Sequence, residues 1–183
     1  MRDAAMRRTV RGRALGLALL LCAGAPAAAV SESGVDGFTV VHERAVAAAP
    51  ASAWAKLIAP AQWWNGAHSY SGVAANMTLD LRAGGCWCEQ WAGGSVEHGR
   101  VIFVQPERTL RLYAALGPLQ PLPSVATLTW TLAKAGEGTK IMLTYRVLGR
   151  AADNIAALAA PVDAVLGEQA DRLAAALGGK ISP

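Results

Sequence analysis

The sequence predicts a single α+β domain in which one antiparallel sheet is flanked by helices along the chain. Between residues 76 and 148, apolar and polar side chains alternate with a period of two, and glycine or proline turns interrupt the alternation, as in successive β-strands. Over residues 161–177, apolar side chains instead recur at the spacing of one helix face. A shorter helical pattern precedes the strands. Together these patterns predict the α+β class.

The elements before the main run of strands are predicted as follows in chain order. Residues 38–46 are β-rich and partly alternating, which predicts a first strand. Residues 48–60 predict a helix, because three apolar side chains recur at helical spacing between two prolines. Residues 61–66 are predicted as a second short helical turn or a loop.

Six consecutive antiparallel strands are predicted next, over residues 76–82, 86–91, 95–105 and 109–116 and as a hairpin over 124–148. The hairpin turns at the segment AGEG, residues 135–138. A short helical segment then leads to the final helix, which has Pro161 in its first turn and ends at Gly178-Gly179. That helix is long enough to cover one face of the sheet.

The N-terminal segment has the three zones of a secretory signal peptide. Five arginines precede a short apolar run over residues 14–23, and small residues follow at 27–29. The apolar run is too short to cross a bilayer, which takes about 20 residues. We therefore predict a signal peptide over residues 1–29 with cleavage after Ala29, and a periplasmic or secreted protein with no stable membrane span. An uncleaved N-terminal anchor is the alternative. Residues 30–37 are predicted as a flexible leader.

Removal of the signal peptide would change the charge of the chain. Residues 1–29 hold five of the 17 Lys and Arg residues and one of the 13 acidic residues, so that twelve of each remain. A nucleic-acid partner requires a net basic surface that releases counterions, and a neutral chain does not provide one. We therefore predict no nucleic-acid partner.

Six segments, taken in order, resemble a known superfamily: APASAWAKL, WW at residues 63–64, DLRAGGCW, HGRVIFVQPERTLRL, GTKIMLTY and LAAPVDAVLGEQADRL. The chain resembles the START-like or polyketide-cyclase (SRPBCC) superfamily, most closely its branch related to the activator of the heat-shock chaperone ATPase. The resemblance covers residues 38–177. It implies a helix-grip domain over residues 38–179, in which a curved antiparallel sheet wraps around a long C-terminal helix and encloses a cavity. The superfamily includes lipid carriers, cyclases, hydrolases and co-chaperone modules, so function must come from the site.

Cys86 and Cys88 lie in the segment GGCWCEQW and share one face of a strand. The sequence favours two free thiols on the sheet surface. A disulfide is an alternative, because same-face neighbours lie about 6.5 Å apart, near the upper limit for bridging. A metal site has the least support, since zinc takes about four ligands and the three histidines of the chain are widely spaced. We predict no metal and no cofactor.

The resemblance implies that the large side chains of this strand face the cavity, so Trp87, Glu89 and Trp91 are predicted to point inward. The same alternation predicts that Glu97 points inward on the next strand, with Gly99, Val101 and Phe103. Further candidates for ligand contact are Trp64, Tyr113 and Trp130 in the wall and His68 and Tyr70 in a loop at the mouth. The alternative is that the aromatic side chains simply fill a core.

Glu89 and Glu97 are the candidates for catalysis. Two carboxylates facing one apolar space would repel each other, and desolvation would raise at least one pKa, giving a general acid and a general base. His98 follows Glu97 in the same predicted strand, so its side chain is predicted to point to the opposite face, toward the surface. Pairing of either glutamate with an arginine is the alternative.

The predicted function is the binding of a small hydrophobic or amphipathic ligand between the sheet and the C-terminal helix. The alternative is a cyclase- or hydrolase-type enzyme that uses a cavity carboxylate. A protein-interaction module like the chaperone activators is the third class, and predicted export weighs against it because that partner and its ATP are cytosolic. The sequence leaves a homodimer open.

Overall fold

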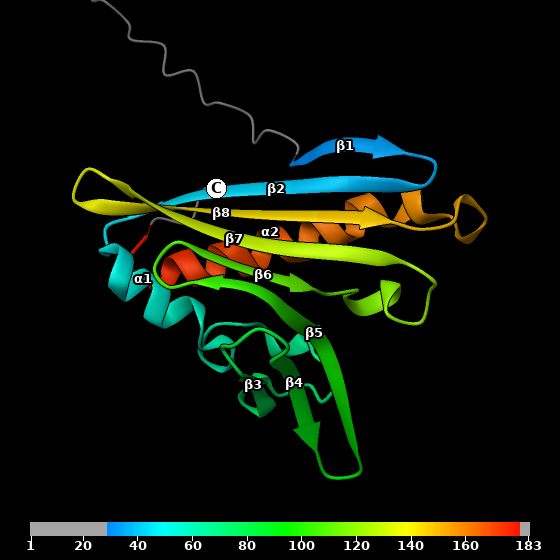
Figure 1. Ribbon diagram of the computed structural model, residues 1–183, viewed down its shortest axis with the longest axis horizontal. Helices are drawn as coiled ribbons and strands as arrows, with labels where there is room; N and C mark the ends of the chain where they lie inside the picture. Colours follow the sequence, from blue (N-terminus) through cyan, green and yellow to red (C-terminus); the bar gives the residue numbers. More distant parts are fainter. Residues whose placement is uncertain (1–28, 180–183) are drawn as a thin grey trace, which may run out of the picture.

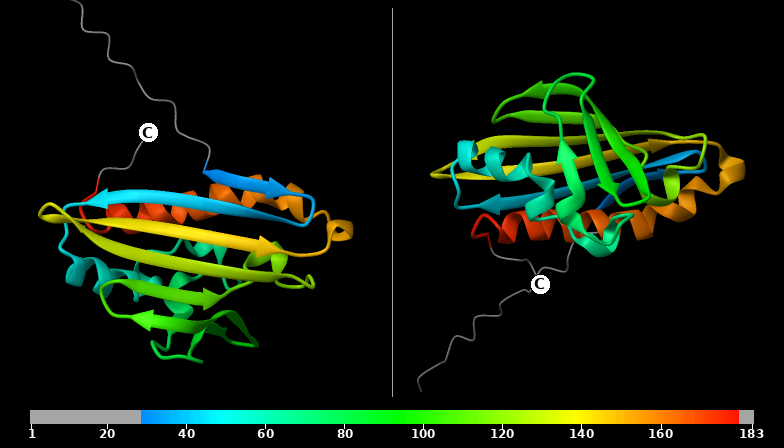
Figure 2. Two further views of the ribbon diagram at one scale, coloured as in Figure 1. Left: turned by 45° about the horizontal axis from the view of Figure 1, so that its top comes forward. Right: turned by 90° about the horizontal axis from the view of Figure 1, so that it is seen from below.

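The computed structural model describes residues 29–179, and the chain forms one eight-stranded antiparallel sheet with its helices on one face (Figures 1 and 2). The strand order is β1-β2-β8-β7-β6-β5-β4-β3. The strands are β1 Val30–Gly34, β2 Gly37–Val46, β3 Met77–Leu79, β4 Cys86–Trp91, β5 Gly94–Gln105, β6 Thr109–Tyr113, β7 Val125–Ala135 and β8 Gly138–Leu148. The predicted signal peptide lies outside the described residues, apart from Ala29, and stays a prediction.

Two α-helices and six short 3-10 helices complete the described part of the chain. The α-helices are α1 Pro50–Leu57 and α2 Ala159–Ala175, and the 3-10 helices are η1 Pro60–Gln62, η2 Gly66–His68, η3 Ala74–Asn76, η4 Gly117–Leu119, η5 Ala151–Asp153 and η6 Ile155–Leu158. Figure 2 shows the sheet curving around α2, with α1 on the same face. The predicted α+β helix-grip fold is confirmed.

The β7–β8 hairpin shows why the sheet forms where the alternation predicted it. On its inner face Leu128, Trp130 and Leu143 are at most 3% exposed, whereas alternate residues reach the surface. The strands join through Gly136 and Glu137, and Gly136 has φ +58°, a left-handed conformation that glycine adopts without steric cost. The predicted hairpin and its turn are confirmed.

Helix α2 packs across β2 through both apolar and polar contacts. Leu166, Ala170 and Leu173 are buried at helical spacing and face the sheet. Close approach depends on Gly167, because a Cβ there would lie 2.9 Å from the ring of His42 on β2. The helix therefore lies tightly against the sheet at this point.

The segment predicted as a flexible leader is part of the sheet. Residues 30–34 form β1, which pairs antiparallel with the start of β2. The prediction is wrong here because four of the five residues of β1 are exposed, so the segment has the composition of a loop although its backbone is paired.

Two irregularities in β5 change which side chains face inward. Trp87 on β4 is opposite Gly99, but the next residue, Cys88, is opposite Glu97, so β5 has an extra residue, His98. A second shift leaves Ile102 as an extra residue relative to β6. Each extra residue in a β-bulge reverses the inside–outside alternation beyond it.

Candidate functional site

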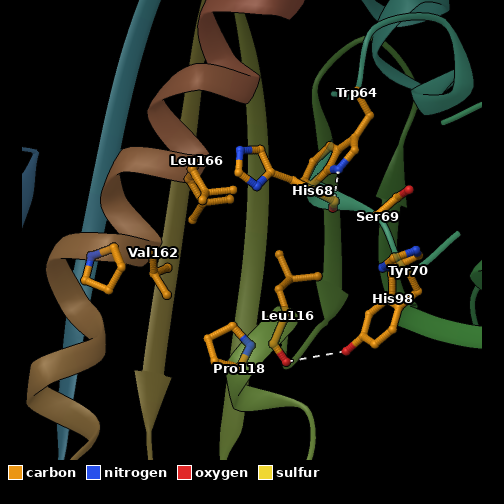
Figure 3. Close-up of a pocket in the computed structure, with 12 residues that line it drawn as sticks. Trp64, His68, Ser69, Tyr70, His98, Leu116, Pro118, Val162 and Leu166 are labelled. Atoms are coloured by element: carbon orange, nitrogen blue, oxygen red, sulfur yellow. Dashed lines mark hydrogen bonds between the residues drawn. The ribbon is translucent and has the colours of Figure 1, made fainter. Parts of the chain in front are cut away.

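A pocket of about 440 Å³ opens between α2, the segment around η4 and the loop that follows Trp64 (Figure 3). His98 of β5 reaches it from the sheet. The residues that line it are Trp64, His68, Ser69 and Tyr70 from the loop, His98, then Leu116, Gly117 and Pro118 around η4, and Pro161, Val162, Val165 and Leu166 of α2. Most of these side chains are apolar, and the polar ones come from the loop and from His98.

The loop that forms one wall is held to α2 by polar contacts. The backbone N–H of Asn65 donates to Oε1 of Gln169 over 2.8 Å, and Nε2 of His68 lies 3.0 Å from Oε2 of Glu168. Arg172 also donates to the carbonyl of Trp63 over 2.8 Å. The wall is therefore fixed by contacts with residues 100 or more positions away in the sequence.

The opposite wall, around η4, is fixed by a buried tyrosine. Tyr145 of β8 is fully buried, and its hydroxyl donates to the carbonyl of Ala114 over 2.8 Å and accepts from the N–H of Leu116 over 3.1 Å. Burial raises the pKa of Tyr145, although the bond from Leu116 opposes the shift. The hydroxyl therefore stays protonated, as its role as a donor requires.

Glu89 lies behind the pocket as a completely buried carboxylate. Its Oε1 accepts from the N–H of Ser71 over 2.7 Å, and its Oε2 accepts from the N–H of Tyr70 over 3.0 Å and from Nε2 of His98 over 2.9 Å. Burial by itself would raise the pKa of Glu89, but hydrogen bonds from Ser71, Tyr70 and His98 outweigh burial and lower it to about 2. The side chain is therefore an ionised anchor for the loop.

His98 is 6% exposed and lies between two aromatic rings. Its ring centroid is 5.0 Å from that of Trp87 and 5.8 Å from that of Tyr70. Burial lowers the pKa of His98, although the bond and charge of Glu89 oppose the shift, so the ring is neutral at pH 7. The prediction of a surface imidazole is wrong, because the bulge turns His98 inward.

The signal for the bulge was present in the sequence but was not recognised. Gly99 follows His98, and a Cβ at Gly99 would lie 2.8 Å from both the Cβ of Ala114 and the carbonyl oxygen of Tyr113. A glycine inside a strand pattern is typical of a bulge or a close backbone approach. Its position beside a histidine could have placed His98 among the candidates.

The prediction that Glu97 faces the cavity is wrong for the same reason. Its side chain is 41% exposed and pairs with Arg100 on the surface. Phe103, also predicted to point inward, is 44% exposed, and the guanidinium of Arg111 lies 5.7 Å from its ring centroid. Among the described residues that line the pocket there is no Asp or Glu. The catalytic hypothesis required a raised pKa, but the pKa of Glu89 is lowered. Neither the placement of the two glutamates nor the pKa of Glu89 therefore supports acid–base catalysis by a carboxylate pair.

The tryptophans form a filled core beside the pocket. Trp63 contacts Trp64 and Trp130 with ring centroids 5.6 and 5.8 Å apart, and Trp64 contacts Trp87 at 5.0 Å. Only about 20 Å³ remains free among them. Of these four tryptophans, only Trp64 also lines the 440 Å³ pocket. Trp87 and Trp130 fill the core, as the alternative to ligand contact predicted.

Two other candidates lie away from the pocket. Trp91 is partly exposed, and its ring lies against Gly94 at the β4–β5 turn. Tyr113 is 56% exposed, because outward and inward residues alternate along β6. The structure therefore gathers Trp64, His68 and Tyr70 around the pocket with Glu89 behind them, but not Trp91 or Tyr113.

Cys86 and Cys88 form a disulfide, so the favoured interpretation of two free thiols is wrong. Their Cα atoms are 5.4 Å apart, less than the spacing assumed for a regular strand. The register shift between β4 and β5 falls between Trp87 and Cys88, so the strand pair is irregular at the same point.

Residues 29–179 contain neither a candidate metal site nor a candidate membrane-spanning helix. Within that range no group of three or more His, Cys, Asp or Glu side chains is arranged to hold a metal ion. No helix in the same range combines the length and the apolar character needed to span a bilayer.

The curved sheet, the long C-terminal helix and the pocket beside it define a START-like, SRPBCC-type helix-grip protein. Residues 47–178 match the family described as activator of Hsp90 ATPase homolog 1-like protein, and the chain belongs to this family. The fold of this family suggests a ligand-binding domain. The comparison with curated proteins finds no match.

Solved structures agree on the fold. A protein from Rhizobium leguminosarum is 24% identical, with a TM-score of 0.56 over 78% of this chain and 95% of its own. A protein from Mesorhizobium loti is 21% identical, with a TM-score of 0.55 over 76% and 96%. One from Chromobacterium violaceum is 18% identical, with a TM-score of 0.54 over 76% and 96%. At these identities the likeness shows the fold alone.

Proposed function

We propose that this protein binds a small hydrophobic or amphipathic molecule in the pocket between α2, η4 and the loop after Trp64. The observation that carries the proposal is the pocket itself. Its volume of about 440 Å³ falls in the range of small-molecule sites, which are mostly apolar with a few convergent polar groups. Leu116, Val162 and Leu166 provide the apolar walls, and polar groups of His68 and His98 lie across from them.

The energetic basis is the burial of ligand surface against these apolar side chains. Each Å² of apolar surface removed from water contributes roughly 25 cal/mol, before the entropic cost of association. Walls held by Tyr145 and by the contacts with Gln169 and Arg172 keep that cost low, because the pocket does not have to be assembled when the ligand arrives.

A direct test uses the neutral fluorescent probe N-phenyl-1-naphthylamine. We expect saturable fluorescence enhancement with the native protein and its loss in Val165→Trp, because the new indole would occupy the pocket from a partly exposed position of α2. Ala164→Trp is the matched control, since Ala164 is the preceding residue and faces solvent. Equal binding by the native protein and Val165→Trp would contradict the proposal.

We propose further that the protein is exported, with cleavage after Ala29. The basic, apolar and small-residue zones of residues 1–29 support this, and so does the Cys86–Cys88 disulfide, because such bonds persist in oxidising compartments. Strand β1 begins at Val30, so cleavage there would leave every strand complete. N-terminal sequencing of protein recovered from the periplasm should begin at Val30. Recovery only from the cytoplasm, with Met1 retained, would contradict export.

The homodimer that the sequence leaves open stays a prediction. Light scattering of the processed protein after size-exclusion chromatography measures it directly.

A further inference from the structure

The pocket contains a buried polar group whose orientation is fixed by a charge behind it. His98 lines the pocket, and its Nε2 lies 2.9 Å from Oε2 of Glu89. The ionised carboxylate of Glu89 has no proton to donate, so Nε2 of His98 must carry the proton that the bond requires. A neutral imidazole with its proton on Nε2 has a lone pair on Nδ1. Glu89 thus makes Nδ1 of His98 a hydrogen-bond acceptor.

The charges around the pocket determine which kind of ligand head group can donate a hydrogen bond to Nδ1 of His98. Among the lining residues that the structure describes there is no lysine and no arginine to neutralise an anionic head group. The carboxylate of Glu89 lies directly behind His98 and would repel an anion. A cationic head group would lose its hydration while finding the Glu89 oxygens already engaged by Ser71, Tyr70 and His98. A neutral donor meets neither penalty.

We propose that the ligand carries a neutral hydroxyl group, an alcohol or a phenol, which donates a hydrogen bond to Nδ1 of His98 while its apolar part lies against α2 and η4. His98 is then the residue that determines specificity, and Glu89 is a positioning residue that acts through it. The inference rests on the proposed ligand-binding function and adds the chemical class of the ligand.

The test compares three probes that share one ring system, 2-naphthol, 2-methoxynaphthalene and 2-naphthoate, as competitors of N-phenyl-1-naphthylamine at pH 7. Methylation of the hydroxyl removes the donor at nearly constant shape, and the carboxylate replaces it with an anion. We expect 2-naphthol to bind about 3- to 10-fold more tightly than 2-methoxynaphthalene, which is the effect of one hydrogen bond, and 2-naphthoate to bind most weakly.

The outcomes separate the two proposals. Equal affinity for 2-naphthol and 2-methoxynaphthalene, or tightest binding of 2-naphthoate, would overturn the hydroxyl proposal and leave the ligand-binding function standing. Binding of the fluorophore with no displacement by any of the three probes would overturn the hydroxyl proposal alone. Absence of saturable fluorophore binding to the native protein would overturn both proposals.

A variant pair assigns the preference to His98. His98→Phe keeps a ring between Trp87 and Tyr70 but removes the acceptor, so the preference for 2-naphthol should fall to a ratio of about 1. Tyr113→Phe is the control, because Tyr113 is exposed on β6 and is not among the residues that line the pocket. An unchanged ratio in His98→Phe would contradict the assignment.

Nuclear magnetic resonance of the native protein decides the case even if His98→Phe does not fold. The chain has three histidines, so long-range ¹H–¹⁵N spectra of the imidazoles can be assigned. We expect the proton of His98 on Nε2 in the free protein, and a shift of the Nδ1 resonance on addition of 2-naphthol but not of 2-methoxynaphthalene. A proton on Nδ1 in the free protein would overturn the proposal.

Discussion

The inner side of the sheet is solid in one region and open in another. Four tryptophan rings, Trp63, Trp64, Trp87 and Trp130, pack against one another at tilted or edge-to-face angles and leave about 20 Å³. Between α2 and η4, by contrast, a pocket of about 440 Å³ remains. Both regions are lined mainly by apolar side chains. The difference comes from shape, because large rings contributed by three separate elements fill the first region.

Aromatic content is therefore a poor guide to a cavity in this fold. The resemblance to a hollow fold was the main reason to expect a cavity under the sheet, and the tryptophans were expected to line it, but most of them fill the core. The open region is lined by medium-sized side chains such as Leu116 and Val162, with prolines that have no large group to extend across the gap. What keeps the pocket open is the polar anchoring of its walls by Tyr145, Gln169 and Glu89.

The sharpest test of the comparison uses two leucines that lie in the different regions. Leu112 is 2% exposed beside the tryptophans, and Leu116 lines the pocket. We expect Leu112→Ala to lower the free energy of unfolding by about 3 kcal/mol, because it leaves a cavity in a packed core. Leu116→Ala should cost less than half as much, since its side chain already borders open space. Urea denaturation measures both, and equal losses would contradict the distinction between the regions.

Glu89 anchors the loop that forms one wall of the pocket. Glu89→Gln would place an amide N–H₂ against backbone donors of Ser71 or Tyr70, and we expect a loss of about 1–3 kcal/mol in the free energy of unfolding. Glu97→Gln is the control, because an exposed ion pair such as that with Arg100 contributes at most about 1 kcal/mol. A Glu89→Gln variant as stable as the control would show that the buried carboxylate is not an anchor.

The same carboxylate predicts how stability depends on pH. The pKa of Glu89 falls from 4.5 to about 2 on folding, so its contribution is present above pH 4.5 and is lost as the pH falls toward 2. The lowered pKa of His98 acts in the same direction, since the unfolded chain takes up a proton near pH 6.5 before the folded chain does. We expect the urea midpoint to fall on acidification, and to fall less steeply below pH 4.5 in Glu89→Gln. Parallel curves for the two proteins would contradict this.

Removal of the Cys86–Cys88 disulfide is expected to have the smallest effect on the free energy of unfolding. Cys86 and Cys88 enclose a single residue, and the chain-entropy relation gives about 1–2 kcal/mol for so short a loop. The double substitution Cys86→Ser, Cys88→Ser should lower the free energy of unfolding by that amount and leave binding of N-phenyl-1-naphthylamine unchanged, because neither cysteine lines the pocket. Loss of probe binding would show that the disulfide supports the pocket after all.

The elements were predictable because they are local patterns. The alternation of β7 and β8 and the helical spacing of α2 lie within short windows of sequence, and the structure confirms them. The site was less predictable for two physical reasons. One inserted residue at the β5 bulge exchanged the facing of Glu97 and His98, and the bonds from Ser71 and Tyr70 to Glu89 join residues that no periodicity relates.

The short strand β1 lies at one edge of the sheet and covers the edge of β2. The proposed cleavage site therefore matters for solubility, because it decides whether β1 is kept. Residues 37–40 of β2 are all buried and pair with β1 on one side. A protease that cut within residues 30–34 would uncover this apolar stretch as an unpaired border, which neighbouring molecules could extend by adding strands of their own. If the chain is cleaved after Ala29 as proposed, β1 stays whole and keeps this stretch of β2 paired.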